Sequence, residues 1–275
     1  MEAQMPEVIS KDGTVIGYDI EGHGPLVILV AGATQYRAID RTRTPNLQKQ
    51  LARQFTVINY DRRGRGDSSD TWPYAVQREI EDIAALISAN GGEARIFGMS
   101  SGAVLAMEAA AAMPRVIKSL ALYEPPIDPA ASVAHYRDEH KTMATLAAEG
   151  RASDMMSRFV LGMGMSEDVL KGFQDDPIWP IYAAAGLTLE HDYRVLADAR
   201  ASDVPPERWQ NAIMPVLVLD GDKSLPFMAA GADWVASTLH NVERVTLADQ
   251  GHEYDPAVLA PLLTVFFERG SVQVH

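Results

Sequence analysis

The heptapeptide FGMSSGA, residues 97–103, separates an apolar run from an alanine-rich one, and it decides the fold predicted for this chain. It contains the pattern G-x-S-x-G with Ser100 at its centre. Where this pattern is functional, a strand ends, the chain turns sharply and a helix begins, so that the strained turn lifts the serine hydroxyl off the sheet. Gly98 and Gly102 lack the Cβ atoms that would clash in such a turn. Ser100 is therefore the predicted nucleophile.

Two other interpretations of this stretch are weaker. Ser101 would need glycines at Met99 and Ala103 to take the central position of the pattern. A glycine-rich turn can also carry a serine that only caps a helix. The apolar run before the turn and the alanine-rich run after it match the strand–turn–helix context and favour the nucleophile.

The rest of the chain alternates between strand-like and helix-like segments. Residues 7–20 read as a hairpin. Strands are predicted over 25–32, 55–61, 94–98, 116–124, 214–222 and 242–249. Helices are predicted around 45–54 and over 74–92, 102–114, 226–240 and 256–268. This alternation indicates an α/β fold with a parallel sheet and helices on both faces.

The alternation is interrupted once. Residues 127–208 contain helical pieces rich in methionine and alanine and no convincing strand. We therefore predict a core domain formed by residues 1–126 and 209–275, with a helical cap, or lid, over 127–208. The methionines at 143, 155, 156, 163 and 165 fit either a pliable wall facing an apolar substrate or plain helix packing.

Composition and charge exclude several classes of function. The 275 residues carry a formal charge of −13, so nucleic acid and anionic membranes are not expected partners. There is no cysteine, which excludes disulfides and thiolate chemistry. Residues 1–13 do not read as a secretory signal, and no apolar run is long enough to span a bilayer. A cytoplasmic protein with a small-molecule substrate is expected, and its oligomeric state is left open.

A serine hydroxyl needs a base, and the base needs an orienting acid. Among the seven histidines, His252 follows the last predicted strand, at the edge of the sheet where Ser100 emerges. For the acid we prefer Asp222, because the order Ser100, Asp222, His252 is the chain order of this motif class. Asp220 is assigned to the strand end, and Glu124 remains the alternative or supporting acid.

Backbone amides are expected to stabilise the oxyanion that forms when the serine attacks. The N–H of Ser101 directly follows the nucleophile. The second donor should come from the loop after the first buried strand, where Ala33 is the best candidate.

With these motifs the chain resembles the α/β-hydrolase fold superfamily, in its serine-nucleophile branch, over essentially its whole length. The segment GMSSG looks like the nucleophile elbow, and YDRRGRGDSS looks like the R-G-x-G-x-S turn of that family. The resemblance implies an α/β-hydrolase fold with an eight-stranded, mostly parallel sheet whose second strand is antiparallel, and no cofactor. Two departures stand out: Ala31 replaces a histidine that many members have, and the spacing from Gly221 to Asp222 is short, which keeps Glu124 open as the acid.

Other motifs are given structural interpretations. The tripeptide Arg65-Gly66-Asp67 lies in a segment without phosphate-binding patterns, so we interpret it as a tight turn. The segments HYRDEH (135–140) and EHDY (190–193) lack zinc-like spacing and are interpreted as solvated helix faces, with no metal site predicted.

The predicted function is hydrolysis of a carboxylic ester or lactone through an acyl-enzyme. Cleavage of a C–C bond and cofactor-free perhydrolysis would use the same residues, so they stay open. A catalytically silent binding protein on the same scaffold is the alternative from another class.

Overall fold

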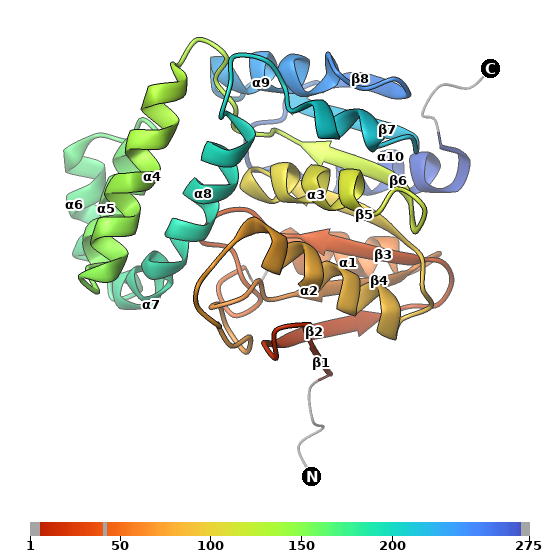
Figure 1. Cartoon of the computed structure of the whole chain (residues 1–275), viewed down its shortest axis with the longest axis horizontal. Coiled ribbons are helices and arrows are strands. Elements are labelled where there is room, and N and C mark those ends of the chain that lie inside the picture. The colour runs from red at the N-terminus through yellow and green to blue at the C-terminus, as the bar shows by residue number, and fades with distance from the viewer. Residues whose placement is uncertain (1–5, 41–42, 271–275) are drawn as a thin grey trace.

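The computed structural model describes residues 6–40 and 43–270, and in them eight strands form one sheet in the order β1-β2-β4-β3-β5-β6-β7-β8 (Figure 1). The strands are β1 (Glu7–Ile9), β2 (Val15–Glu21), β3 (Leu26–Val30), β4 (Thr56–Tyr60), β5 (Ala94–Met99), β6 (Ile117–Tyr123), β7 (Val216–Gly221) and β8 (Val242–Leu247). β2 is antiparallel to both of its neighbours, and the strands from β4 to β8 are parallel. The expected fold class is confirmed.

The continuous apolar runs are strands buried on both faces. In β3, Ile28 and Val30 belong to the apolar core on one side of the sheet, and Val27 and Leu29 to the core on the other side. Both faces of a parallel sheet are covered by helices, so its strands are apolar throughout instead of alternating with polar residues.

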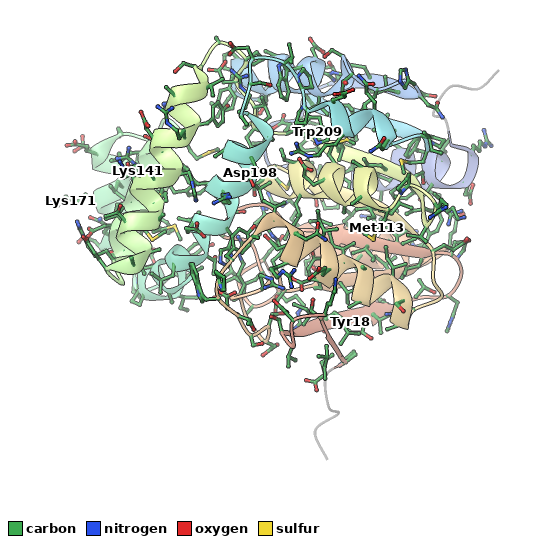
Figure 2. The ribbon with its side chains drawn as sticks, viewed as in Figure 1. Tyr18, Met113, Lys141, Lys171, Asp198 and Trp209 are labelled. Atoms are coloured by element: carbon green, nitrogen blue, oxygen red, sulfur yellow. The ribbon has the colours of Figure 1, made fainter. Side chains whose placement is uncertain are left out.

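Helices cover the two faces as expected. The described helices are α1 (Arg43–Leu51), α2 (Val76–Ala89), α3 (Ser101–Ala112), α4 (Val133–Ala148), α5 (Ala152–Gly162), α6 (Glu167–Gln174), α7 (Trp179–Ala184), α8 (Leu189–Ala199), α9 (Pro226–Ala236) and α10 (Pro256–Arg269), with short turns η1 (Ala185–Thr188) and η2 (Glu207–Asn211). In Figure 1, α2 and α3 lie in front of the sheet, and α1 and α10 lie behind it. Trp209 of η2 is fully buried beside α3 and donates its indole N–H to Glu108 over 3.0 Å (Figure 2).

Residues 127–208 contain α4 to α8 and no strand, and most of these helices stand to one side of the sheet (Figure 1). They have an apolar cluster of their own, which includes Met143, Met155 and Met156. Helix α8 joins the two parts: Leu189 belongs to that cluster, whereas Val195 packs in the core of the sheet. The boundaries predicted for a cap domain stay a prediction.

The parallel strands place the predicted site residues at one edge of the sheet. The turns that follow β3, β5, β6, β7 and β8 all leave from the carboxyl ends of parallel neighbours. In folds of this type, ligands bind at this edge. Within residues 6–40 and 43–270, every helix is too short or too polar to cross a bilayer.

Candidate active site

Ser100 occupies a strained turn between β5 and α3. Its φ of 55° and ψ of −129° lie in a region of backbone conformation that residues other than glycine rarely adopt. The flanking glycines are needed for close packing. A Cβ on Gly98 would lie 2.5 Å from the carbonyl oxygen of Gly102, and one on Gly102 would lie 2.4 Å from the oxygen of Ala31. The sequence pattern therefore reports a real steric constraint.

The end of β6 holds the segments that carry the serine and the histidine. The N–H of Ser100 donates to the carbonyl oxygen of Tyr123 over 2.9 Å. The hydroxyl of the same tyrosine donates to the carbonyl oxygen of Gly251 over 2.5 Å, next to His252. One strand end thus anchors both the elbow and the histidine loop.

His252 pairs with Glu124. Nδ1 of the imidazole lies 2.6 Å from Oε2 of the glutamate, whose side chain is fully buried. The same carboxylate accepts the N–H of Gly221 over 2.9 Å and the hydroxyl of Ser224 over 2.7 Å. Glu124 has a φ of 48°, a second strained residue at this edge. Three donors therefore fix the carboxylate, and it in turn orients the imidazole.

The preference for Asp222 as the partner of His252 is corrected by this geometry. Oδ1 of Asp222 accepts the N–H of Asp249 over 2.7 Å, so its carboxylate ties two loops together. Among the described hydrogen bonds and ion pairs, none joins Asp222 to His252. Asp220 is buried and accepts from Arg244 and Thr246, each over 2.7 Å, which agrees with its assignment to the strand end.

The Ser100 hydroxyl makes no hydrogen bond to His252 in the described part of the chain. Catalytic hydrogen bonds are often long without substrate and tighten in the reacting complex. What the structure provides is the common anchoring of both residues on the end of β6.

The candidate amide donors lie beside the serine. A Cβ on Gly32 would be 3.0 Å from Cβ of Ser100, so the loop after β3 abuts the nucleophile. Ala33, Ser100 and Ser101 line one cavity of about 240 Å³. Ser101 is itself buried, and its hydroxyl donates to Oδ1 of Asp192 over 2.7 Å.

The cavity has a mixed wall. Besides these three residues, it is lined by Pro126, Asp128, Ala131, His135, Tyr136, Glu139, Phe159, Gly162, Met163, Asp192, Tyr193, Leu196 and Phe227. Burial raises the pKa of both Tyr136 and Tyr193, so these phenols stay neutral. Met163 lines the cavity, whereas Met143, Met155 and Met156 pack among the helices and Met165 is exposed. Helix packing therefore holds for three of the five methionines, and a wall facing the substrate stays a prediction for Met163.

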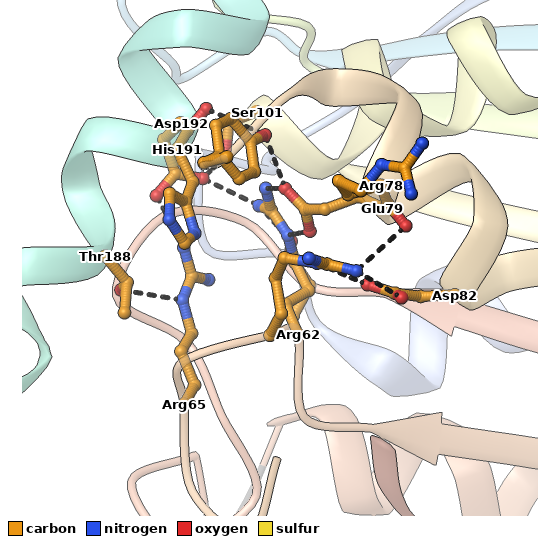
Figure 3. A network of polar contacts seen from close by, with 12 residues as sticks. Arg62, Arg65, Arg78, Glu79, Asp82, Ser101, Thr188, His191 and Asp192 are labelled. Carbon is orange, nitrogen blue, oxygen red and sulfur yellow. Dashed lines mark hydrogen bonds and ion pairs between the residues drawn. The ribbon is translucent and has the colours of Figure 1, made fainter. Parts of the chain in front are cut away.

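A buried ion-pair network lies behind the cavity, between the sheet and α8 (Figure 3). Asp192 accepts from Arg62 over 2.6 Å and from Arg65 over 2.5 Å. Glu79 binds the Arg62 guanidinium through both of its oxygens, at 2.6 and 2.7 Å. Burial by itself would raise the pKa of Glu79, but the charge and hydrogen bonds of Arg62 outweigh it and lower the pKa to about 2. Glu79 is therefore ionised at neutral pH.

This network corrects one prediction and agrees with another. The segment 190–193 was expected to be a solvated face, yet Glu190, His191 and Asp192 are all buried. Their polar pattern marks an interface with buried charges, which sequence alone does not distinguish from a wet surface. The turn that contains Arg65, Gly66 and Asp67 is structural as expected, since a Cβ on Gly66 would collide with the Asp61 carboxylate at 2.1 Å.

Two other observations narrow the choice of site. A larger, open hollow of about 890 Å³ lies elsewhere, around Met113 and Asn211, and its described lining contains no histidine or carboxylate. Among the described residues, no group of three histidines or carboxylates is arranged to hold a metal ion. Of the predicted site residues, Ala33, Ser100 and Ser101 line the smaller cavity, whereas His252 and Glu124 are joined to the Ser100 turn through the end of β6.

Comparison with known proteins agrees with the observed fold. A family model described as "Alpha/beta hydrolase family" matches residues 27–263. The crystal structure of an alpha/beta hydrolase from Sphaerobacter thermophilus is similar at 42% identity and a TM-score of 0.81, covering 95% of this chain and 100% of that one. A thermophilic esterase from Thermogutta terrifontis shares the fold at 19% identity and a TM-score of 0.71, covering 98% and 99%.

Two curated relatives are also similar. BpoC of Mycobacterium tuberculosis, which carries the provisional name non-heme bromoperoxidase, is 27% identical over 252 residues, or 86% of this chain and 90% of that protein. The hydrolase YraK of Bacillus subtilis, itself uncharacterised, is 30% identical over 117 residues, which is 41% of this chain and 42% of YraK.

Proposed function

The chain belongs to the alpha/beta hydrolase family, and from that premise we propose that it is a serine hydrolase that cleaves a carboxylic ester or lactone through an acyl-enzyme. The observation that carries the proposal is the 2.6 Å pair between His252 and Glu124, anchored on the same strand end as the strained Ser100. A serine in such a turn, with an oriented imidazole nearby, is the arrangement that activates an alcohol.

In the proposed reaction, Nε2 of His252 takes the proton of the Ser100 hydroxyl as its oxygen attacks the substrate carbonyl. Glu124 holds Nδ1 and stabilises the imidazolium that forms. The N–H groups of Ala33 and Ser101 bind the oxyanion. His252 then returns the proton to the leaving alcohol and afterwards activates the water that releases the acid.

The size and wall of the cavity support a small, partly apolar substrate. Its volume of about 240 Å³ is smaller than that of most ligand pockets, which run from about 300 to 1,000 Å³. Phe159, Leu196 and Phe227 supply apolar surface for an acyl chain. The helices α4 to α8 would form the cap over it.

A second candidate, cofactor-free perhydrolysis of a carboxylic acid, is favoured by the similarity to BpoC and its provisional name. It would use the same serine and histidine with hydrogen peroxide in place of water, so it differs in the acyl acceptor and not in the residues.

The test is a panel of p-nitrophenyl esters of increasing acyl length, with wild type and Ser100→Ala measured beside labelling by a fluorophosphonate probe. We expect wild type to hydrolyse the short esters and to be labelled, and S100A to lose at least about 10³-fold in kcat and all labelling. Equal turnover by S100A and wild type would contradict the proposal. Peroxide added to acetate, with peracid measured, distinguishes the second candidate.

A further inference from the structure

We propose that Asp192 of helix α8 is a positioning residue for both amides of the oxyanion hole: its carboxylate holds Ser101 directly and the Gly32–Ala33 peptide through Arg65. This inference rests on the proposed function, and it gives a helix far along the chain a part in the same site. Figure 3 shows Asp192 beside Ser101, with Arg65 and Arg62 reaching toward it from the loop between β4 and α2.

The first connection is the hydroxyl of Ser101. It donates to Oδ1 of Asp192 over 2.7 Å, and both side chains are buried. The amide of Ser101 is the donor that directly follows the nucleophile, at the first residue of α3. Fixing the side chain of this residue fixes its backbone against α8, so the amide cannot turn away from the cavity without breaking a buried, charge-assisted hydrogen bond.

The second connection runs through Arg65. Its guanidinium donates from one nitrogen to Oδ2 of Asp192 over 2.5 Å and from the other to the carbonyl oxygen of Gly32 over 2.7 Å. That carbonyl and the N–H of Ala33 belong to one planar peptide unit, so holding the oxygen sets the direction of the N–H. A cation bound to the oxygen also polarises the peptide and strengthens its N–H as a donor.

Arg65 depends on this carboxylate more than Arg62 does. Arg62 has Glu79 as a bidentate partner, whereas in the described residues Asp192 is the carboxylate that pairs with Arg65. The other acceptors around the Arg65 guanidinium are neutral, namely the hydroxyl of Thr188 and the carbonyls of Gly32 and Gln35. Losing the charge at Asp192 would leave a buried guanidinium without its counterion beside the loop that carries Ala33.

A positioning role differs from a contact with the acyl chain, although Asp192 also lines the cavity. The oxyanion forms only as the serine attacks, so amides out of place lower kcat and leave KM nearly unchanged. The oxyanion is common to all esters, so the loss should be the same for short and long acyl chains. A residue that contacts the acyl group would instead change KM and the chain-length preference.

The experiment measures kcat and KM for wild type, Asp192→Asn, Ser101→Ala and the double variant. Values of kcat are given per active serine, which complete fluorophosphonate labelling counts. Asp198→Asn is the matched control. It lies on the same helix (Figure 2) but forms a half-exposed pair with Arg194, away from the cavity. We expect kcat to fall about 10- to 100-fold in D192N and about 10-fold in S101A, with KM within about threefold, since losing a whole oxyanion donor costs about 10² to 10³. D198N should match wild type.

In the double variant, the two losses should combine to less than their product, because both act on one hydrogen bond. Values of kcat for D192N and S101A within twofold of wild type would overturn the inference, and so would a loss that appears in KM or varies with acyl length. If D192N does not fold, S101A alone decides by the same criteria. If S100A is inactive while D192N and S101A keep wild-type turnover, this inference is refuted and the proposed function stands. If S100A itself keeps its turnover, both are refuted.

Discussion

Nδ1 of His252 lies 2.6 Å from Oε2 of Glu124, so the imidazole is oriented from the end of β6 and not from the end of β7. The carboxylate is fully buried and receives two further hydrogen bonds, from Gly221 and Ser224. A buried carboxylate held by three hydrogen bonds is a rigid support for the imidazole that we propose as the base.

The pair predicts which acid matters. Glu124→Gln keeps the size of the side chain but cannot stabilise an imidazolium, so we expect kcat for p-nitrophenyl acetate to fall about 10³- to 10⁴-fold. Asp222→Asn is the matched control, because in the described residues its carboxylate accepts the N–H of Asp249, makes no hydrogen bond to His252 and lies 3.9 Å from Nζ of Lys223. Its kcat should stay within about threefold of wild type. The assignment is wrong if D222N loses more activity than E124Q.

The glycines of the elbow predict a stability effect. Gly102→Ala places a methyl group 2.4 Å from the carbonyl oxygens of Val30 and Ala31, and these backbone atoms at the end of β3 cannot move aside as a flexible side chain could. We expect the free energy of unfolding to fall by about 3 kcal/mol, measured by urea denaturation, and ester turnover to be lost. Gly172→Ala is the control, since this glycine is exposed within α6 and has open space around it. That variant should gain up to about 1 kcal/mol.

The contrast between Ser100 and Glu124 shows which parts of the site could be predicted from the sequence. The elbow was predictable because its requirements are local: a strand, two glycines and a helix within a few residues. The apolar runs likewise predicted strands buried on both faces. Choosing the acid needed the spatial order of the strands. Since β6 and β7 are parallel neighbours, Glu124 and Asp222 leave the sheet at the same edge. Chain order alone favoured Asp222, whereas the structure pairs His252 with Glu124.

Two signals for Glu124 were present but weak. One was the short spacing from Gly221 to Asp222, and the other was the position of Glu124 directly after a buried strand. Its φ of 48° and its three donors could not be predicted. The contact between Asp192 and Ser101 was out of reach for another reason: it joins residues 91 positions apart, and a polar helical face looks the same in sequence whether it is wet or paired in the interior.

The wall of the cavity predicts a change in chain-length preference. Phe227 lines the cavity at the start of α9 and is partly buried, so Phe227→Ala should enlarge the acyl pocket. Each additional buried CH₂ contributes about 0.8 kcal/mol, or roughly fourfold in kcat/KM. We expect the optimum to move by two or more carbons toward longer esters in the p-nitrophenyl series. Ile181→Ala removes an exposed apolar side chain from α7, outside the cavity lining, and should leave the optimum unchanged. An unchanged optimum in F227A would show that the acyl chain lies elsewhere.

The buried network predicts how stability depends on pH. The Arg62 guanidinium overcomes the effect of burial and lowers the pKa of Glu79 from 4.5 to about 2 in the folded chain. The unfolded chain therefore binds a proton between these values that the folded chain does not, so stability falls as the pH drops through this window. The contribution of Glu79 is complete above about pH 4.5 and is lost by about pH 2, and it amounts to about 3 kcal/mol.

Glu79→Gln should therefore be less stable than wild type at pH 7, and the free energies of unfolding of the two proteins should converge on acidification. Urea unfolding at pH 7, 4.5 and 3 measures this, with Glu93→Gln, which disrupts an exposed pair with Lys118, as the control that should run parallel to wild type. Parallel curves for E79Q and wild type would mean that Glu79 is not the ionised partner of Arg62.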